Sequence, residues 1–268
     1  MLQYERTNAV VSLTLIGLAL YFVLEFPTRA ASVTLFGSPL GVNAPRRWLM
    51  AMLLVSLVMA GTDMVIRSHP TLPGRRLGYL ATFWMLPGLL VVAATQILGF
   101  VPNAVVWGAS LLGTGLLLWL TIVAEFQGVP TGAGRRPRWA TLWQQMIGYG
   151  LVLVLFALIY HARSRSALSA SEVLLVSSMV AVSLLRLPPA QISRTWLYAS
   201  LIGLCLGQMT WALNYWRIST LTGSLLLFLT FYVLVGLTQQ HLLSTLTRRT
   251  LWEYGAIAVV ALGVIYNL

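Results

Sequence analysis

The stretch from Trp196 to Arg249 places more polar side chains in apolar surroundings than any other part of this sequence, so its residue types are the first to consider for binding or reaction. Their surroundings are apolar, and a side-chain amide in hydrocarbon needs a hydrogen-bond partner. We therefore expect Gln208 to face other protein rather than lipid, so that Gln208→Leu weakens helix packing by about 0.5 to 2 kcal/mol. The stretch predicts a polar bundle interior formed by Gln208, Thr210, Asn214, Thr230 and Tyr232.

A second polar group follows where this stretch ends. A His at a helix end can donate a proton or contact lipid phosphates, and Arg side chains bind anions through paired N–H groups. The sequence therefore predicts an interfacial site for an anion or a lipid head group, formed by Gln239, Gln240, His241, Arg248 and Arg249.

The ionisable side chains do not favour a catalytic or metal site. Ion-coupled transport usually needs a carboxylate or imidazole deep in the membrane, and a haem held by two His needs facing imidazoles. The spacing also lacks a His-x-x-x-His pattern for a metal. We predict no catalytic residue, no metal and no cofactor, because these groups fall at or near the ends of apolar segments: Glu5, Glu25, Asp63, Glu125, Glu172, Glu253, His69, His161 and His241.

The elements that position these residues follow from composition. The chain of 268 residues is 58% hydrophobic and only 9% charged, with a mean hydropathy of +0.83. This is far more apolar than a soluble domain. With about 20 residues for each crossing, we expect an all-α, polytopic transmembrane helix bundle of about nine spans (eight to ten), forming a single integral membrane domain over residues 1–268.

Local patterns add detail to this bundle. Residues 31–45 alternate apolar side chains around Gly37-Ser38-Pro39, which predicts a short interfacial β-hairpin or re-entrant element.

Asp63 and Arg67 are spaced for an i,i+4 ion pair. Ser169 and Glu172 form a capping-box pattern, so a helix should begin there. Small residues at close spacing predict helix-packing seams at Gly203 and Gly207 and at Ala109 and Gly113.

The charge pattern orients the chain. Its formal net charge is +11, and all 17 basic residues are Arg. They are scattered in pairs over many loops, so binding of nucleic acid is not expected. An N-terminus in the cytoplasm places eleven Arg on that side and six on the other, as the positive-inside rule prefers. We expect a multi-pass protein of the cell membrane with its C-terminus on the opposite side.

The C-terminal third also carries a resemblance. The run Phe231-Tyr232-Val233-Leu234-Val235-Gly236-Leu237, then Gln239-Gln240-His241, Arg248-Arg249 and Glu253-Tyr254, together with Leu35-Phe36-Gly37-Ser38-Pro39-Leu40, resembles a family of uncharacterised bacterial polytopic membrane proteins of unknown function. The resemblance implies a multi-span fold without an assigned activity.

Three classes of function remain open. The first is a non-catalytic membrane protein that acts through packing or partner binding, as an accessory or assembly subunit. The second is an uncoupled carrier, channel or lipid-handling protein with a polar cavity near Gln208. The third is an interfacial enzyme that acts on lipid-linked substrates, with His241 as proton donor. Membrane lipids are the expected partners, and other membrane subunits belong to the first class.

Overall fold

The computed structural model describes residues 2–23, 31–35, 38–42, 45–70, 72, 77–129, 137–162, 166–216, 218–245 and 247–266. Within these ranges the chain forms nine α-helices, one β-hairpin, and short 3-10 turns at Leu98–Phe100 and Pro189–Gln191. The helices are α1 (Leu2–Val23), α2 (Pro45–Arg67), α3 (Leu77–Ile97), α4 (Ala104–Gln127), α5 (Arg138–Ala162), α6 (Ser166–Leu184), α7 (Ile192–Leu213), α8 (Thr220–Leu242) and α9 (Arg248–Tyr266).

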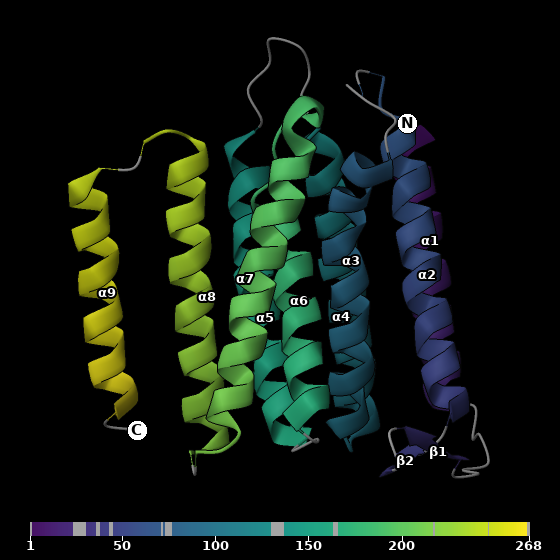
Figure 1. The fold of residues 1–268 in the computed structure, drawn as a ribbon. Helices are drawn as coiled ribbons and strands as arrows, with labels where there is room; N and C mark the ends of the chain where they lie inside the picture. Colours follow the sequence, from purple (N-terminus) through teal and green to yellow (C-terminus); the bar gives the residue numbers. More distant parts are fainter. Residues whose placement is uncertain are drawn as a thin grey trace.

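Successive helices run in alternating directions and form a bundle, with the two termini at opposite ends (Figure 1). Among the described residues, eight helices, α1 to α8, are long and apolar enough to cross a membrane. The ninth, α9, lies beside α8 and carries Arg248, Arg249 and Glu253 in its first turns. The expected bundle of eight to ten spans is therefore confirmed.

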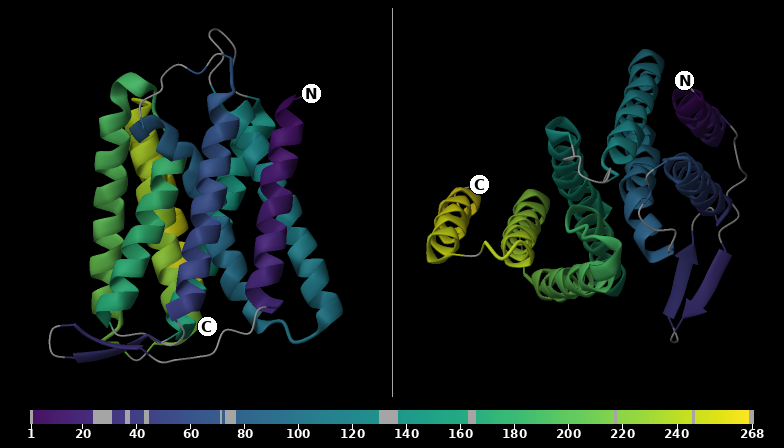
Figure 2. Two further views of the ribbon diagram at one scale, coloured as in Figure 1. Left: turned by 90° about the vertical axis from the view of Figure 1, so that its right-hand side faces the viewer. Right: turned by 90° about the horizontal axis from the view of Figure 1, so that it is seen from above.

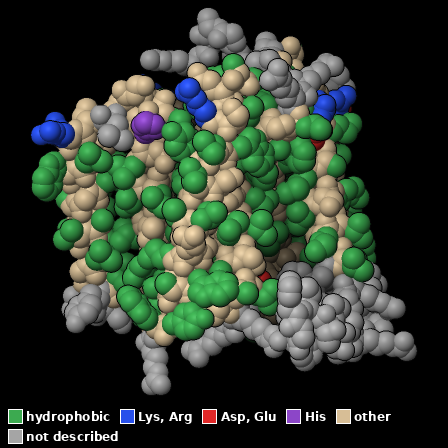
Figure 3. Space-filling model, viewed as in Figure 1, with side chains coloured by type: hydrophobic (Ala, Val, Ile, Leu, Met, Phe, Trp, Pro, Cys, Tyr) green, Lys and Arg blue, Asp and Glu red, His purple; other side chains and the backbone are tan. Residues whose placement is uncertain are grey.

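The outer surface fits this reading. Figure 3 shows hydrophobic side chains over the middle of one face, with Arg side chains near the end of the bundle that holds the N-terminus. At the opposite end lies the hairpin, formed by β1 (Ala31–Leu35) and β2 (Ser38–Val42). The two strands pair antiparallel, with Val33 opposite Leu40. The hairpin expected within residues 31–45 is thus present.

The most enclosed helix is α3, which packs among α2, α4, α5 and α6. In its most apolar stretch 67% of the residues are buried. The main hydrophobic core includes Leu86 of α3, Phe156 of α5 and Phe231 of α8. Seen from above, α1 and α2 lie toward one edge of the bundle, whereas α8 and α9 form the other (Figure 2).

The closest helix contact joins α6 and α7, because glycines let the backbones approach. A Cβ at Gly203 would lie 2.7 Å from the carbonyl oxygen of Leu174, and one at Gly207 would lie 3.2 Å from that of Ala170. The structure places this pair where the sequence expected a packing seam. Small side chains therefore set the α6–α7 distance.

The second expected seam differs in the structure. Ala109 and Gly113 are exposed on α4, and a Cβ at Gly113 would meet nothing within 4 Å. The close contact of α4 is made instead by Gly115, where a Cβ would lie 2.6 Å from a Leu15 methyl group of α1. Gly115 is two positions from Gly113, which is about 200° around a helix, so the inward face is the opposite one.

Two local predictions have different outcomes. The ion pair is confirmed, since Arg67 Nε lies 2.5 Å from Asp63 Oδ2. The capping box at Ser169 is wrong, because α6 begins three residues earlier, at Ser166. Ser169 therefore lies inside the first turn, where its hydroxyl donates to the Ser166 carbonyl oxygen at 3.2 Å.

Candidate functional site

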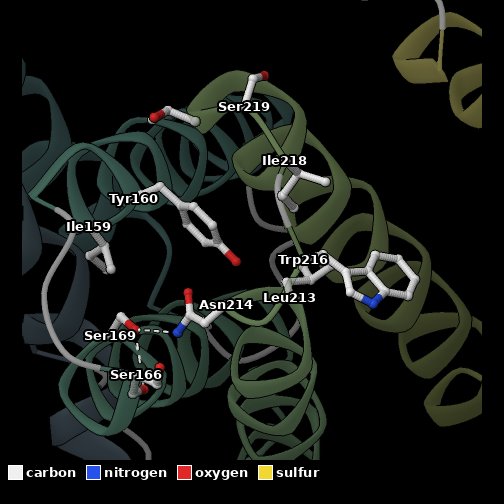
Figure 4. Close-up of a pocket in the computed structure, with 10 residues that line it drawn as sticks. Ile159, Tyr160, Ser166, Ser169, Leu213, Asn214, Trp216, Ile218 and Ser219 are labelled. Atoms are coloured by element: carbon white, nitrogen blue, oxygen red, sulfur yellow. Dashed lines mark hydrogen bonds between the residues drawn. The ribbon is translucent and has the colours of Figure 1, made fainter.

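A pocket of about 560 Å³ opens at the end of the bundle opposite the N-terminus. It lies where α5 ends, α6 begins and the turn between α7 and α8 crosses (Figure 4). Its volume falls within the range of about 300 to 1,000 Å³ that is usual for small-molecule sites. The lining residues are Ile159, Tyr160, Ser166, Ser169, Leu213, Asn214, Trp216, Ile218, Ser219 and Thr220.

One hydrogen-bond chain fixes the orientation of the pocket amide. Because Ser169 donates its only hydroxyl hydrogen to the Ser166 carbonyl oxygen, its oxygen must accept from Asn214. The Asn214 Nδ2 to Ser169 Oγ distance is 2.8 Å. The amide nitrogen is therefore held on the α6 side, and Figure 4 shows the amide oxygen on the side of Tyr160.

The Tyr160 hydroxyl faces that amide across the pocket (Figure 4). Its oxygen is buried and has no hydrogen-bond partner among the described residues. The ring is held by α8, since a Cβ at Gly223 would lie 2.7 Å from Tyr160 Cε1. A buried polar atom without a partner is uncommon in folded proteins, so the Tyr160 hydroxyl is the group in this pocket whose hydrogen-bonding capacity is unused.

The chemistry of this pocket is that of binding. Its described lining contains no Asp, Glu, His, Arg or Cys side chain, and its polar groups are hydroxyls and one amide. Such groups donate and accept hydrogen bonds near neutral pH without exchanging protons. The described lining therefore offers hydrogen-bonding groups and no carboxylate or imidazole.

Only one residue of the predicted polar interior reaches this pocket, namely Asn214. Thr210 is buried and donates to the Leu206 carbonyl oxygen of its own helix at 2.8 Å. Thr230 bonds within α8 and contacts Met209 Sδ at 3.4 Å. The ring of Tyr232 lies 5.5 Å from that of Tyr149, beside an apolar groove between α8 and α9.

The position of the Gln208 side chain differs most from the prediction that it faces other protein. Its side chain is exposed on α7 and makes no hydrogen bond to another described residue, so within this chain it does not face protein. It lines a largely apolar groove of about 470 Å³ between α6 and α7, formed by Ala167, Ala170, Ser171, Leu174, Leu204, Gly207, Gln208, Trp211 and Ala212. The hollow beside Gln208 is thus a largely apolar groove on the outer face, whereas the carrier or channel alternative required a polar cavity there.

The predicted interfacial group lies at the end of the bundle that holds the N-terminus, where its members have separate partners. Gln239 donates to the Leu184 carbonyl oxygen at 3.1 Å, and Gln240 accepts from the Thr245 hydroxyl. The His241 ring lies 5.9 Å from that of Tyr198. Arg249 pairs with Glu253 at 3.0 Å, and Arg248 is exposed. No described pocket is lined by His241 together with these Arg side chains.

A buried ion pair is the polar feature that the sequence did not reveal. Arg186 Nη1 lies 2.8 Å from Glu125 Oε2, and each side chain is only 1% exposed. The guanidinium also donates to the Thr82 carbonyl oxygen at 2.5 Å and lies 3.8 Å from the centre of the Phe83 ring. Gln144 donates to the other Glu125 oxygen at 3.2 Å. This cluster joins α3, α4 and α5 to the end of α6.

The cluster agrees with the predicted placement of Glu125 near the end of an apolar segment, but its burial was not predicted. Glu125 does lie in the last turn of α4, but it is enclosed by other helices rather than by solvent. Arg186 follows α6, where the sequence predicted a loop, yet its side chain is buried in the bundle. Burial of the charge is tolerated because the pair is hydrogen-bonded on several sides.

The signals that could have found these sites are weak or absent in the sequence. Tyr160, Ser166 and Ser219 stand at the ends of apolar segments, where hydroxyl groups are common. Glu125 and Arg186 are 61 positions apart, and no local pattern pairs them. The exposure of Gln208 had a signal, because Gly203 and Gly207 fix which face of α7 packs on α6, and the next residue points about 100° away.

Comparison with known proteins gives a family and no activity. A family model described as "Protein of unknown function (DUF5656)" matches residues 26–268. No curated protein and no solved structure matches the chain. Among the described residues, no three His, Cys, Asp or Glu side chains are grouped so that they could hold a metal ion.

Proposed function

The chain belongs to the family of unknown function DUF5656, and from that premise we propose that it is a non-catalytic integral membrane protein that binds a transmembrane helix of a partner protein. The observation that carries this proposal is the exposed Gln208 amide in the groove between α6 and α7. An amide that faces lipid loses its hydrogen bonds, whereas an amide that faces a second helix can regain them.

The position of Gln208 supports this reading. It lies five residues before the end of α7, which is about 7 to 8 Å along the helix. This depth is within the outer part of the hydrocarbon region, since the half-thickness of the core is about 15 Å. A partner side chain that both donates and accepts would satisfy the amide there.

The shape of the groove also supports a helix as its occupant. Ala167, Ala170, Gly207 and Ala212 present almost no side-chain bulk, and small residues let helix backbones approach closely in membranes. Trp211 and Leu204 flank the amide, so the groove offers apolar walls around a single polar point. A lipid acyl chain would fill such walls without using the amide.

Two further parts of the proposal concern the membrane itself. The N-terminus lies on the cytoplasmic side and the C-terminus on the opposite side, supported by the excess of Arg at the N-terminal end of the bundle. Bilayer lipids are the surrounding partners of the apolar face in Figure 3. The accessory role follows from a binding surface that carries no acid, base or metal-ligand cluster among its described residues.

Site-specific photocrosslinking in native membranes tests the proposal. A benzophenone amino acid replaces Leu204, which lines the groove and is 48% exposed, or Leu112 of α4, which is 70% exposed on another face. We expect an ultraviolet-dependent protein adduct of defined mass from position 204 and none from position 112. Adding Gln208→Leu should abolish that adduct. An adduct of twice the chain mass identifies the partner as a second copy of this chain.

Crosslinking to lipid alone at both positions would refute helix binding. The same conclusion would follow if the adduct at position 204 survived Gln208→Leu unchanged, because the amide would then contribute nothing to partner recognition.

A further inference from the structure

We propose that the pocket between Tyr160 and Asn214 binds a neutral polyhydroxylated group, of the kind found in a sugar or polyol. This site lies at the end of the bundle, whereas the groove beside Gln208 runs along its side. The inference is therefore independent of helix binding, and either proposal can fail without the other.

The first step is the pair of unfilled hydrogen-bonding positions. The Tyr160 hydroxyl is buried without a partner, and the Asn214 oxygen faces it because Ser169 holds the amide nitrogen (Figure 4). A phenol hydroxyl can donate and accept, but an amide oxygen can only accept. A group placed between them must donate to Asn214 and can exchange a hydrogen bond with Tyr160. A hydroxyl group meets both requirements.

The second step excludes a strongly charged ligand. A carboxylate or a phosphodiester has no hydrogen to donate to the fixed Asn214 oxygen and would be repelled by it. A cation would need a carboxylate to offset its desolvation, and the described lining contains none. The remaining hydroxyls, on Ser166, Ser219 and Thr220, suit a ligand that carries several alternating donors and acceptors.

The third step concerns where the ligand comes from. The pocket lies at the boundary of the helix bundle, and Trp216 at its rim is 67% exposed, as expected for an aromatic residue at a membrane interface. Ile159, Leu213 and Ile218 form the apolar part of the wall. A sugar head group of a lipid and a free sugar share the chemistry that the polar part recognises.

The test measures binding to the full chain in phosphatidylcholine nanodiscs. One arm adds glucosyl diacylglycerol to the nanodiscs and measures the lipid retained on the protein by native mass spectrometry. The other arm measures binding of radiolabelled glucose to lipid-matched nanodiscs. Diacylglycerol and phosphatidic acid serve as comparison lipids, because diacylglycerol lacks the sugar and phosphatidic acid carries an anionic phosphate without a polyol.

Tyr160→Phe removes only the hydroxyl and keeps the ring against Gly223, so we expect the fold to persist with an affinity lower by about three- to tenfold. Tyr198→Phe, on the other end of the bundle, is the matched control and should bind as wild type. Melting temperatures of both variants verify folding. Asn214→Ala removes the other hydrogen-bonding group of the same pocket, so it should also lower the sugar affinity.

The outcomes separate the two sources. Retention of the glucosyl lipid without binding of glucose indicates a lipid head group, and binding of glucose indicates a free solute. The proposal is overturned if neither sugar form binds, if phosphatidic acid binds equally well, or if Tyr160→Phe leaves the sugar affinity unchanged. In each of those cases the pocket does not recognise a polyol through the Tyr160 hydroxyl.

Discussion

Glu125 and Arg186 form an ion pair of 2.8 Å that is shielded from solvent on all sides, with each side chain 1% exposed. The pair links the last turn of α4 to the segment that follows α6. Its energetic meaning depends on which partner is removed, because a buried charge without its counter-charge is far costlier than the pair is favourable.

We expect Glu125→Ala to lower the free energy of unfolding by about 3 to 5 kcal/mol, since it leaves the Arg186 guanidinium uncompensated. The matched control is Glu253→Ala, which removes the exposed pair with Arg249 and should change stability by at most about 1 kcal/mol. Thermal unfolding in detergent measures both. Equal melting temperatures for the two variants would contradict a structural role of the buried pair.

The α6–α7 contact should be sensitive to a single methyl group. Gly203→Ala places a Cβ against the Ser178 hydroxyl and the Leu174 carbonyl oxygen, so we expect a destabilisation of about 1 to 3 kcal/mol. Gly113→Ala enters open space and should be neutral or stabilising by up to about 1 kcal/mol, because Ala favours the helix. Melting temperatures in one detergent compare the two, and a reversed order would disprove the packing argument.

The two glutamines should differ in their effect on the isolated chain. Gln239→Leu removes the bond of 3.1 Å to the Leu184 carbonyl oxygen and should cost about 0.5 to 2 kcal/mol. Gln208→Leu should leave the stability of the monomer within about 0.5 kcal/mol, because the amide is exposed. The free energy of unfolding of the monomeric chain tests this difference. A larger loss of stability for Gln208→Leu than for Gln239→Leu would contradict the exposed position of Gln208.

The pH dependence of stability should include a contribution from His69, which lies beyond the end of α2. Burial lowers the pKa of His69, so the folded state favours the neutral ring. This contribution is present above the ordinary pKa of about 6.5 and is lost as pH falls toward the lower folded value. His69→Gln should reduce the fall in melting temperature between pH 8 and pH 5, measured in one detergent, and an unchanged fall would contradict this contribution.

The proposed orientation can be read from cysteine labelling. In a Cys205→Ser background, Tyr215→Cys introduces a thiol between α7 and α8, and Thr247→Cys introduces one between α8 and α9, at opposite ends of the bundle. A membrane-impermeant maleimide should label Tyr215→Cys in intact cells and label Thr247→Cys only after permeabilisation. The reverse pattern would place the N-terminus outside.

Local patterns were sufficient for much of the fold. Hydropathy located the helices, the turn residues Gly37 to Pro39 located the hairpin, and the i,i+4 spacing located the Asp63–Arg67 pair. Each of these depends on neighbours in the sequence, so one chain contains the required information.

The candidate site depended on geometry that such patterns do not contain. Ser169 and Asn214 are 45 positions apart, and they meet only because α6 and α7 pack closely along their length. The sequence pattern suggested that Ser169 caps a helix, which hid its hydrogen bond with Asn214. The capping prediction was wrong because α6 begins about one turn earlier. The rotation of α7 likewise decided which of its polar residues faces the interior.

The contact between α8 and α9 has a consequence for how the chain tolerates change. A Cβ at Gly236 would overlap the Tyr254 ring, whereas many other α9 side chains, such as Trp252, Val259 and Val260, have little protein around them. The contact of the Tyr254 ring with Gly236 therefore helps to position α9 against α8. A side chain at position 236 would have to displace the Tyr254 ring, so we expect a substitution there to loosen α9 while the packing of α1 to α7 is retained.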